Sequence, residues 1–188
     1  MPPRARITRE MIVGAGFEVA REQGIESVNA RTVSERLGCS TQPVMYHFRR
    51  IEELRQAVYQ RADEYHTGYI TDGGDGPPML SIGLAYIRFA QEEKHLFRLL
   101  FQSDGFAGKS VAELIEAEAL APVIGALSGA AGVDGARARA IFTSLFLLVH
   151  GYASMFANNS LDYDEAAIAA DLKRAFVGAV YAAKEETL

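Results

Sequence analysis

The stretch Asn29–Leu54, which reads NARTVSERLGCSTQPVMYHFRRIEEL, decides the fold of this chain. Its first part predicts a short helix that Asn29 can cap, with Val33 and Leu37 as the buried positions. Gly38 follows directly, and glycine readily adopts the left-handed backbone conformation that ends a helix. We therefore expect a short helix that stops sharply at this glycine.

A second short helix is expected on the other side of the turn. Ser40 can cap its first turn, and Pro43 falls within that turn, where a missing N–H costs little. Val44 and Phe48 share one face and are expected to be buried. The outward positions are Thr41, Gln42, Met45 and Tyr46. Two helices joined in this way form a helix-turn-helix, whose second helix fits into the major groove of DNA.

Longer helices flank this pair. One is expected from an N-cap at Thr8 to Gly24, with apolar residues at spacings of three and four. Its buried stripe comprises Ile12, Ala15, Gly16, Val19 and Ala20. Another is expected from about Ile51 to Tyr69. Residues 1–7, which include the two arginines Arg4 and Arg6, are expected to be a basic arm.

The remainder of the chain also has helical periodicity. A run rich in Gly, Asp and Pro at residues 71–78 breaks the pattern, and helical spacing resumes at Met79. Ser110 and Glu113 predict a capping box for a further helix, which Pro122 kinks or interrupts. No stretch alternates as a strand does. The sequence therefore predicts an all-α protein.

We expect about nine helices in two domains. We expect residues 1–50 to form a three-helix DNA-binding headpiece and residues 51–188 to form a helical body. The helix expected at 135–158 is apolar around most of its girth, and the helix expected at 163–185 has small residues along one face. Two such helices that meet their symmetry copies would form the four-helix interface of a homodimer.

Composition bounds the class of protein. Of the 188 residues, 49% are hydrophobic, which excludes a disordered chain. We expect no membrane span and no signal peptide, and therefore a cytoplasmic protein. The single cysteine, Cys39, excludes an intrachain disulfide and is expected to be a buried structural thiol.

Charge is divided unevenly along the chain. The net charge is −5, yet residues 1–61 hold ten arginines and seven glutamates, a balance of +3. Residues 62–188 carry the balance of −8. A modestly cationic headpiece on an acidic body suits a protein that touches DNA phosphates with one end.

The chain resembles the tetracycline-repressor (TetR) family of bacterial transcriptional regulators. The motifs that carry the resemblance are Ile-Val-Gly-Ala-Gly in the first helix, Leu-Gly-Cys-Ser at the turn, Tyr46-His47-Phe48 and Glu52-Glu53-Leu54. Phe89-Ala90, Glu93 and Val149-His150-Gly151 look like the C-terminal domains of one branch of the family. Two positions depart from the pattern: Met45 stands where a tyrosine is common, and Ile51 where a lysine usually opens the next helix.

By resemblance, DNA contacts come from the first turns of the two short helices and from residues around them. Arg31 can bind guanine through two hydrogen bonds, Gln42 can read adenine, and Thr41 or Pro43 can contact a thymine methyl group. Thr32 belongs to the same set. Phosphate contacts, which fix the register rather than the sequence, are expected from Thr8, Ser40, Tyr46, His47, Arg49 and Arg50.

The resemblance also implies an effector site between the helices of the body. The candidate ligand-binding residues are Tyr86, Phe89, Phe97, Phe101, Phe146 and His150, with Phe142 and Phe156 as further aromatic residues. This aromatic content would suit a small, largely apolar or aromatic ligand. Aromatic residues at helical spacing are nevertheless more often part of an ordinary core than of a ligand site.

The sequence gives no sign of catalysis. His47, His66, His95 and His150 lie on different expected helices, without the paired spacing of a metal site. No phosphate-binding Gly-x-x-x-x-Gly-Lys loop occurs. We expect no enzyme activity, no metal and no cofactor.

Together these features predict a sequence-specific DNA-binding regulator, a repressor that a small-molecule effector releases from a near-palindromic operator. Three alternatives stay open. The regulator could answer to a protein partner, the chain could be a small helical enzyme with a helix-turn-helix appended, or it could be a dimeric scaffold that no longer binds DNA.

Overall fold

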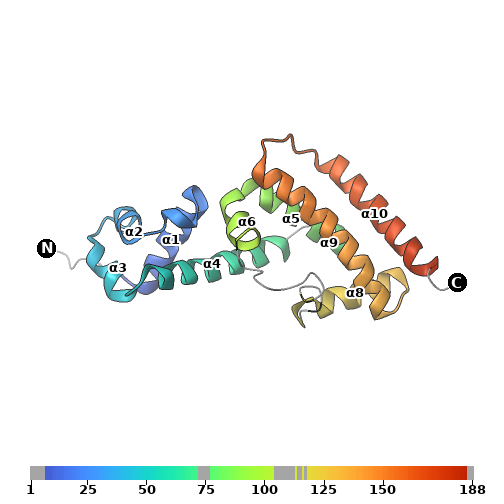
Figure 1. Ribbon diagram of the computed structural model, residues 1–188, viewed down its shortest axis with the longest axis horizontal. Coiled ribbons are helices and arrows are strands. Elements are labelled where there is room, and N and C mark those ends of the chain that lie inside the picture. The colour runs from blue at the N-terminus through green and yellow to red at the C-terminus, as the bar shows by residue number, and fades with distance from the viewer. Residues whose placement is uncertain (1–6, 72–76, 104–112, 114–115, 117, 186–188) are drawn as a thin grey trace. The chain divides into compact units, whose positions relative to one another are not determined.

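The structure is a computed structural model that describes residues 7–71, 77–103, 113, 116 and 118–185 (Figure 1). Regular elements in these ranges are helices and none is a strand, so the all-α prediction is confirmed. The α-helices described are α1 (Arg9–Gln23), α2 (Ala30–Arg36), α3 (Thr41–His47), α4 (Ile51–Thr71), α5 (Pro78–Glu92), α6 (Lys94–Phe101), α8 (Ala121–Ala131), α9 (Gly135–Asn158) and α10 (Glu165–Glu185). Two short 3-10 helices are η1 (Ile25–Ser27) and η3 (Glu118–Leu120).

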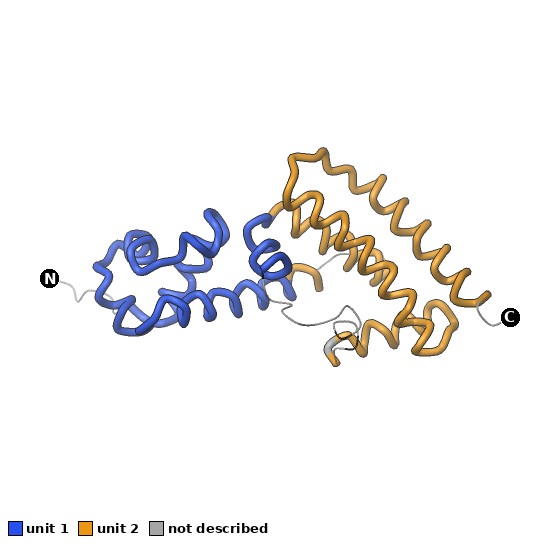
Figure 2. Tube along the Cα trace, in the orientation of Figure 1, with its two compact units in different colours: residues 1–68, 93–105 blue, residues 69–92, 106–188 orange. Residues whose placement is uncertain are grey.

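The chain forms two compact units (Figure 2). Unit 1 consists of residues 1–68 and 93–105, and unit 2 of residues 69–92 and 106–188. Helix α6 therefore packs with α1 in unit 1, although α5, which precedes it in the sequence, belongs to unit 2. The boundary expected after residue 50 separates a DNA-binding part from the rest by function, whereas the two units are defined by their internal contacts. The functional boundary stays a prediction.

The helix ends of the headpiece lie where the sequence predicts them, with one difference in how they are capped. The Thr8 hydroxyl accepts the N–H of Met11 at 3.3 Å and caps α1. Gly24 and Gly38 follow α1 and α2 with φ angles of 88° and 62°, a region that favours glycine. Ser40 precedes α3 but makes no side-chain capping bond, so that prediction is wrong. Pro43, the third residue of the helix, has no N–H, which removes one of the two groups that an N-cap side chain can accept.

The inner faces of α1 and α4 approach closely at Gly16. The stripe predicted on α1 is buried, as is Phe17, which the periodicity missed. A methyl group at Gly16 would lie 2.8 Å from Cγ2 of the fully buried Val58, whereas one at Gly14 would meet no atom within 4 Å. Glycine at position 16 therefore permits the contact between the two helices.

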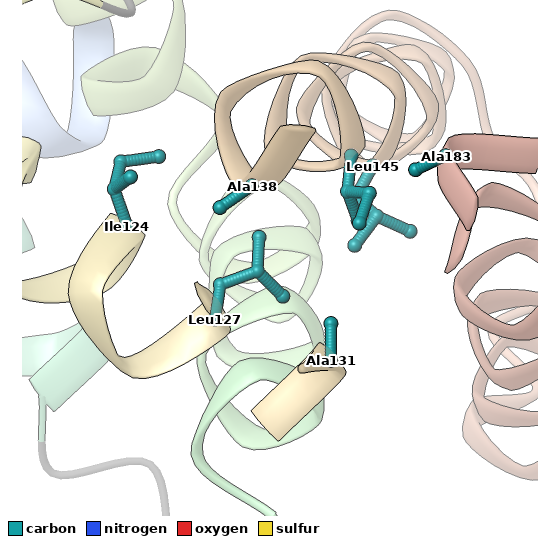
Figure 3. Close-up of a cluster of buried hydrophobic side chains, with 7 residues drawn as sticks. Ile124, Leu127, Ala131, Ala138, Leu145 and Ala183 are labelled. Carbon is teal, nitrogen blue, oxygen red and sulfur yellow. The ribbon is translucent and has the colours of Figure 1, made fainter. Parts of the chain in front are cut away.

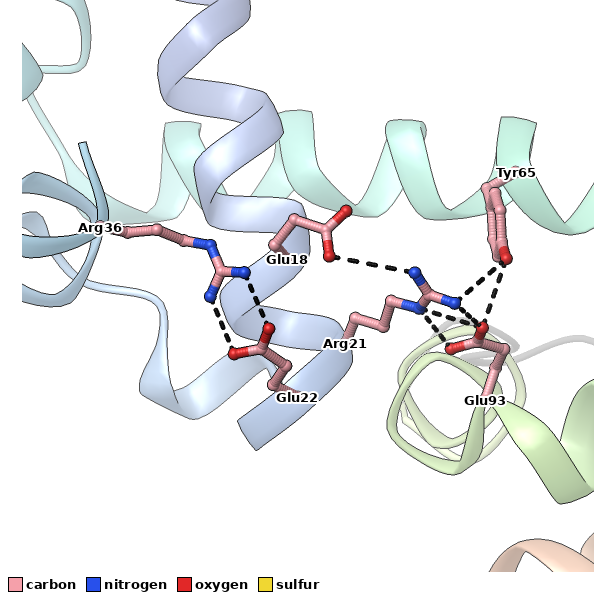
Figure 4. A network of polar contacts seen from close by, with 6 residues as sticks. All are labelled: Glu18, Arg21, Glu22, Arg36, Tyr65 and Glu93. Carbon is pink, nitrogen blue, oxygen red and sulfur yellow. Dashed lines mark hydrogen bonds and ion pairs between the residues drawn. The ribbon is translucent and has the colours of Figure 1, made fainter.

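A buried carboxylate ties three helices of unit 1 together (Figure 4). Nε of Arg21 in α1 donates to both oxygens of Glu93 at 3.0 and 2.8 Å, and Tyr65 of α4 donates to Glu93 at 3.3 Å. The Glu93 side chain, at the start of α6, is 7% exposed. A second pair, Arg36 of α2 with Glu22 of α1, has bonds of 2.8 and 2.7 Å but lies nearer the surface.

Helix α9 is the central element of unit 2 and packs against α5, α8 and α10. At one end, Leu127 of α8 and Leu145 of α9 share a cluster with the small residues Ala138 and Ala183 (Figure 3). A second cluster joins α5, α9 and α10 through Ile87, Phe156, Ile168 and Leu172. Apolar residues on several sides of α9 are therefore buried against three different partners.

Pro122 is the second residue of α8, a position where a residue without an N–H is tolerated because no N–H bond is made there. The helix that Pro122 was expected to kink or interrupt starts outside the described residues, so that expectation stays a prediction. Cys39 is half-buried rather than buried. The basic arm with Arg4 and Arg6 and the capping residue Ser110 lie outside the described residues.

Helix α9 is also long and apolar enough to cross a membrane, contrary to the expectation that no segment would be. Its most apolar window of 18 residues has a mean hydropathy of 1.6. A single helix of this kind is a weak indication, since the central helix of a soluble bundle passes the same test. Only 28% of that window is buried among the described residues, so its contacts with three helices account for part of its apolar composition.

Alanine at Gly16 and at Gly14 is expected to change stability in opposite directions. Gly16→Ala should lower the free energy of unfolding by roughly 1–3 kcal/mol, because the buried, β-branched Val58 cannot move aside. Gly14→Ala should raise it by roughly 0.5–1 kcal/mol, because alanine loses less entropy in a helix. Urea unfolding measures both, and a destabilised Gly14→Ala protein would contradict this account.

Removal of Arg21 is expected to cost far more than removal of Arg36. Arg21→Ala leaves the Glu93 carboxylate buried without its guanidinium and should lower the free energy of unfolding by roughly 2 kcal/mol, less than for a fully buried pair because Arg21 is 39% exposed. Arg36→Ala breaks a more exposed pair and should cost less than about 1 kcal/mol. Chemical denaturation of both variants under one buffer condition would compare them, and equal losses would refute the role assigned to burial.

Candidate DNA-binding surface and ligand-binding cluster

Helices α2 and α3 have a buried, apolar inner face and an exposed, polar outer face. Val33, Val44 and Phe48 are at most 3% exposed and fix the pair against the rest of unit 1. The side chains predicted to face DNA from α3 lie on the other side, and Tyr46 is 76% exposed. The exposed residues of this surface are Arg31, Ser40, Thr41, Gln42, Met45, Tyr46, Arg49 and Arg50.

The first turn of α2, which carries Arg31, is fixed by a capping box. The Asn29 side chain accepts the N–H groups of Arg31 and Thr32 at 3.0 and 3.1 Å. The Thr32 hydroxyl in turn accepts the Asn29 N–H at 3.2 Å and donates to the Ser27 carbonyl at 2.7 Å. The hydroxyl of Thr32 is thus engaged inside the protein, where it orients the turn that presents Arg31.

Arg31 projects into solvent and is bound at one point only. Its side chain is 84% exposed, and Nε donates to the Glu35 carboxylate one helical turn later at 2.8 Å. The described residues provide no other polar partner for its guanidinium. Both terminal nitrogens therefore remain available to a ligand in the groove.

Residues predicted to contact phosphate gather at the end of α3 and the start of α1. Nε2 of His47 bonds the carbonyl of Ile7 at 3.2 Å, which places the neighbouring Thr8 at the same edge. The Arg50 guanidinium lies 3.5 Å from Glu52, whereas that of Arg49 forms no ion pair with a described residue. This edge adds positive charge next to the outer face of α3.

The two departures from the family pattern share one location. Met45 and Ile51 both line a pocket of about 200 Å³ between α2, α3 and α4. The remaining lining residues are Asn29, Ala30, Val44, Phe48, Leu54 and Arg55. Apolar side chains thus replace two polar ones beside the predicted DNA surface, and the sequence did not indicate that they lie together.

Unit 2 brings together part of the predicted ligand-binding set. The Tyr86 hydroxyl lies 3.0 Å from Nδ1 of His150, joining α5 to α9. The rings of Phe142, Phe146 and His150 stack along α9, with centroids 6.1 and 5.7 Å apart. Phe89, in contrast, is fully buried and packs against Tyr69. Tyr86, Phe146 and His150 therefore form a cluster, while Phe89 has a core position.

Both polar members of this cluster are uncharged at neutral pH. Burial raises the pKa of the Tyr86 hydroxyl above its ordinary value, and burial lowers the pKa of His150. The Tyr86 hydroxyl therefore remains a hydrogen-bond donor, and the neutral imidazole can accept that hydrogen bond at Nδ1. A neutral pair of this kind suits a ligand with little charge.

The other two predicted ligand-binding residues belong to unit 1. Phe97 and Phe101 lie on α6, with ring centroids 5.1 Å apart, and Phe97 is fully buried. The ring of His66 in α4 meets Phe101 edge-on at 4.9 Å. In the sequence, His66 stands out only as one of four histidines on different expected helices. Its spacing of four from Ala62 and eight from Val58 was the signal that it lies on the buried face of α4.

His66 is expected to make unit 1 sensitive to acid. Burial lowers its pKa to about 4, below the 6.5 of an exposed histidine, so the unfolded chain takes up the proton more readily. Its contribution to stability is complete above about pH 6.5 and is lost as the pH falls towards 4, by roughly 2 kcal/mol at about pH 5.

Urea unfolding at about pH 7 and about pH 5 measures this loss. We expect His66→Phe to reduce the difference between the two pH values by roughly 2 kcal/mol relative to the unmodified protein. Phe97→Leu, which changes a fully buried ring of unit 1 that does not titrate, should leave the difference intact. An unchanged pH dependence in His66→Phe would show that other groups cause the acid sensitivity.

Comparison with known proteins places this architecture in a family. A family model described as "Tetracyclin repressor-like, C-terminal domain" matches residues 79–177, which is more than half of the chain. No curated protein matches the sequence. The described residues contain no group of three or more His, Cys, Asp or Glu side chains that could hold a metal ion. With its all-α fold and this match, the chain belongs to the tetracycline-repressor (TetR) family of transcription regulators.

Proposed function

We propose that this protein is a cytoplasmic, homodimeric repressor that binds a near-palindromic operator and releases it when a small, largely apolar or aromatic effector binds. Regulators of this family bind DNA and small-molecule effectors and dimerise, and they are not enzymes. The observation that carries the proposal is the α2–α3 pair, with polar side chains on its exposed face and Val44 and Phe48 beneath.

In the proposed complex, α3 enters the major groove and α2 lies across its edge. Arg31 binds guanine, Gln42 and Thr41 contact neighbouring bases, and Arg49 and Arg50 bind phosphates. Arg31, Thr41 and Gln42 are exposed side chains on helices whose opposite faces are buried, and Arg49 and Arg50 are exposed in the turn between α3 and α4. The protein therefore pays little reorganisation cost when it binds.

The proposed dimer interface is the outer face of α9 and α10. Leu147 and Met155 on α9 are 51% and 54% exposed, and Val177 and Tyr181 on α10 are 66% and 67% exposed. Exposed apolar side chains gathered on two adjacent helices are typical of a surface that another subunit covers. A two-fold axis beside these helices would give the four-helix interface expected from the sequence.

The proposed effector site is the cluster of Tyr86, Phe146 and His150. The flat rings supply stacking surface, and the hydroxyl–imidazole pair supplies polarity without charge. An effector can release DNA only if it prefers one arrangement of the two headpieces, and α4 is the continuous element that can transmit this preference. In the proposed mechanism, the effector widens the spacing between the two recognition helices.

Selection of bound duplexes from a random DNA pool tests the proposed function. The purified dimer should recover a palindromic sequence, and Arg31→Ala should erase one base preference in each half-site and weaken binding by roughly 10- to 100-fold. The double variant Arg49→Ala, Arg50→Ala is the matched control. It should weaken binding to all duplexes alike and reduce the dependence on salt, because only phosphate contacts are lost.

Failure to recover any sequence above the salt-sensitive background, from protein shown to be folded and dimeric, would reject sequence-specific regulation by this chain. Recovery of a palindrome whose base preferences do not change in Arg31→Ala would keep the function but reject the assigned contact.

A charge placed on the outer face of α10 should break the dimer. Val177→Asp would bury two unpaired carboxylates at a two-fold interface, so we expect the dimer dissociation constant to rise roughly 100-fold or more. Sedimentation velocity over a range of concentrations measures the change, and circular dichroism verifies the helical fold. Met11→Asp, at an exposed apolar residue of α1, is the control that should remain dimeric. A dimeric Val177→Asp protein would place the interface elsewhere.

A further inference from the structure

The arginines of α2 are held in two different ways. Both terminal nitrogens of Arg36 donate to the two oxygens of Glu22, at 2.8 and 2.7 Å. In Arg31, only Nε donates a hydrogen bond, to Oε1 of Glu35 at 2.8 Å. The terminal edge of the guanidinium is thus occupied in Arg36 and open in Arg31.

This difference matters because guanine is read by two parallel N–H bonds to O6 and N7. An arginine can offer them from the terminal edge, which has Nη1 and Nη2, or from the side edge, which has Nε and Nη2. Glu35 occupies Nε and removes the side edge from use. The geometry left to Arg31 is end-on, with both terminal nitrogens offered to the base.

We propose that Glu35 is a positioning residue that sharpens the selection of guanine by Arg31, an inference that rests on the proposed DNA-binding function. The capping box of Asn29 and Thr32 fixes the backbone beneath Arg31, and Glu35 fixes the far end of its side chain. A long side chain held at both ends loses less rotamer entropy when it meets a base.

The exposed Arg31–Glu35 pair contributes little to folding stability, since its side chains are 84% and 61% exposed. The pair acts on DNA binding instead, because exclusion of water from the groove strengthens the hydrogen bond between Arg31 and Glu35. The same carboxylate repels the phosphates of DNA. Glu35 therefore lowers affinity for DNA in general and raises discrimination at one base pair, two effects of opposite sign.

The test uses the duplex recovered by selection and its three variants at the base pair whose preference Arg31→Ala erases. We expect Glu35→Ala to reduce the preference for guanine there by about threefold to tenfold, the range expected when one long side chain must be ordered on binding. Affinity for a random duplex should rise in the same variant. Glu35→Gln, which keeps an oxygen acceptor for Nε but loses the charge, should retain most of the preference and show the same rise.

Two controls separate positioning from other roles. Glu22→Ala removes a carboxylate from Arg36 and should leave the base preference intact. In an Arg31→Ala background, Glu35→Ala should have no further effect on preference. An unchanged preference in Glu35→Ala alone would overturn the inference, as would an equal change with and without Arg31, which would mean that Glu35 reads a base itself.

These outcomes are distinct from failure of the proposed function. If the folded dimer selects no duplex, the function and this inference fall together. In the second case, the dimer selects a duplex whose base preference depends on Arg31. If Glu35→Ala then prefers guanine as strongly as the unmodified protein does, only the inference fails.

Discussion

Helices α2 and α3 have seven residues each, and isolated helices of that length are not stable in water. Their geometry therefore depends on burial of Val33, Val44 and Phe48 against the other helices of unit 1. That packing in turn depends on the close approach of α1 and α4 at Gly16. The positions of the exposed side chains on the opposite face follow from these apolar contacts. The buried packing therefore determines the geometry of the candidate DNA-binding surface.

The same physical rule acts on the long helix of unit 2, with a different result. Helix α9 is apolar on several sides and is covered by three helices, yet Leu147 and Met155 stay exposed. Val177 and Tyr181 of α10 are exposed as well. The small residues Ala138 and Ala183 let the neighbouring helices pack closely inside the unit. Apolar surface left over after this packing is what the proposed dimer would bury.

Electrostatics in unit 1 depend on pairing more than on the count of charges. Arg21 and Arg36 are committed to carboxylates on other helices, while Arg31 is held by Nε alone. A balance of +3 over residues 1–61 therefore overstates the cations that can reach a phosphate or a base. Which arginines can act is decided by the direction from which each glutamate binds them.

The sequence by itself determined the features that depend on neighbours along the chain. The caps at Thr8 and Asn29, the turn at Gly38, the long helix at 135–158 and the polar outer face of α3 all follow from spacings of a few residues. A family resemblance was visible for the same reason.

Tertiary structure decided which distant residues meet. It divided the predicted ligand set, with Tyr86 beside His150 in unit 2 and Phe101 beside His66 in unit 1. It also brought Met45 and Ile51 to one pocket. No local spacing encodes such pairings, because they arise from how whole helices pack, and packing depends on the combined shape of side chains far apart in the sequence.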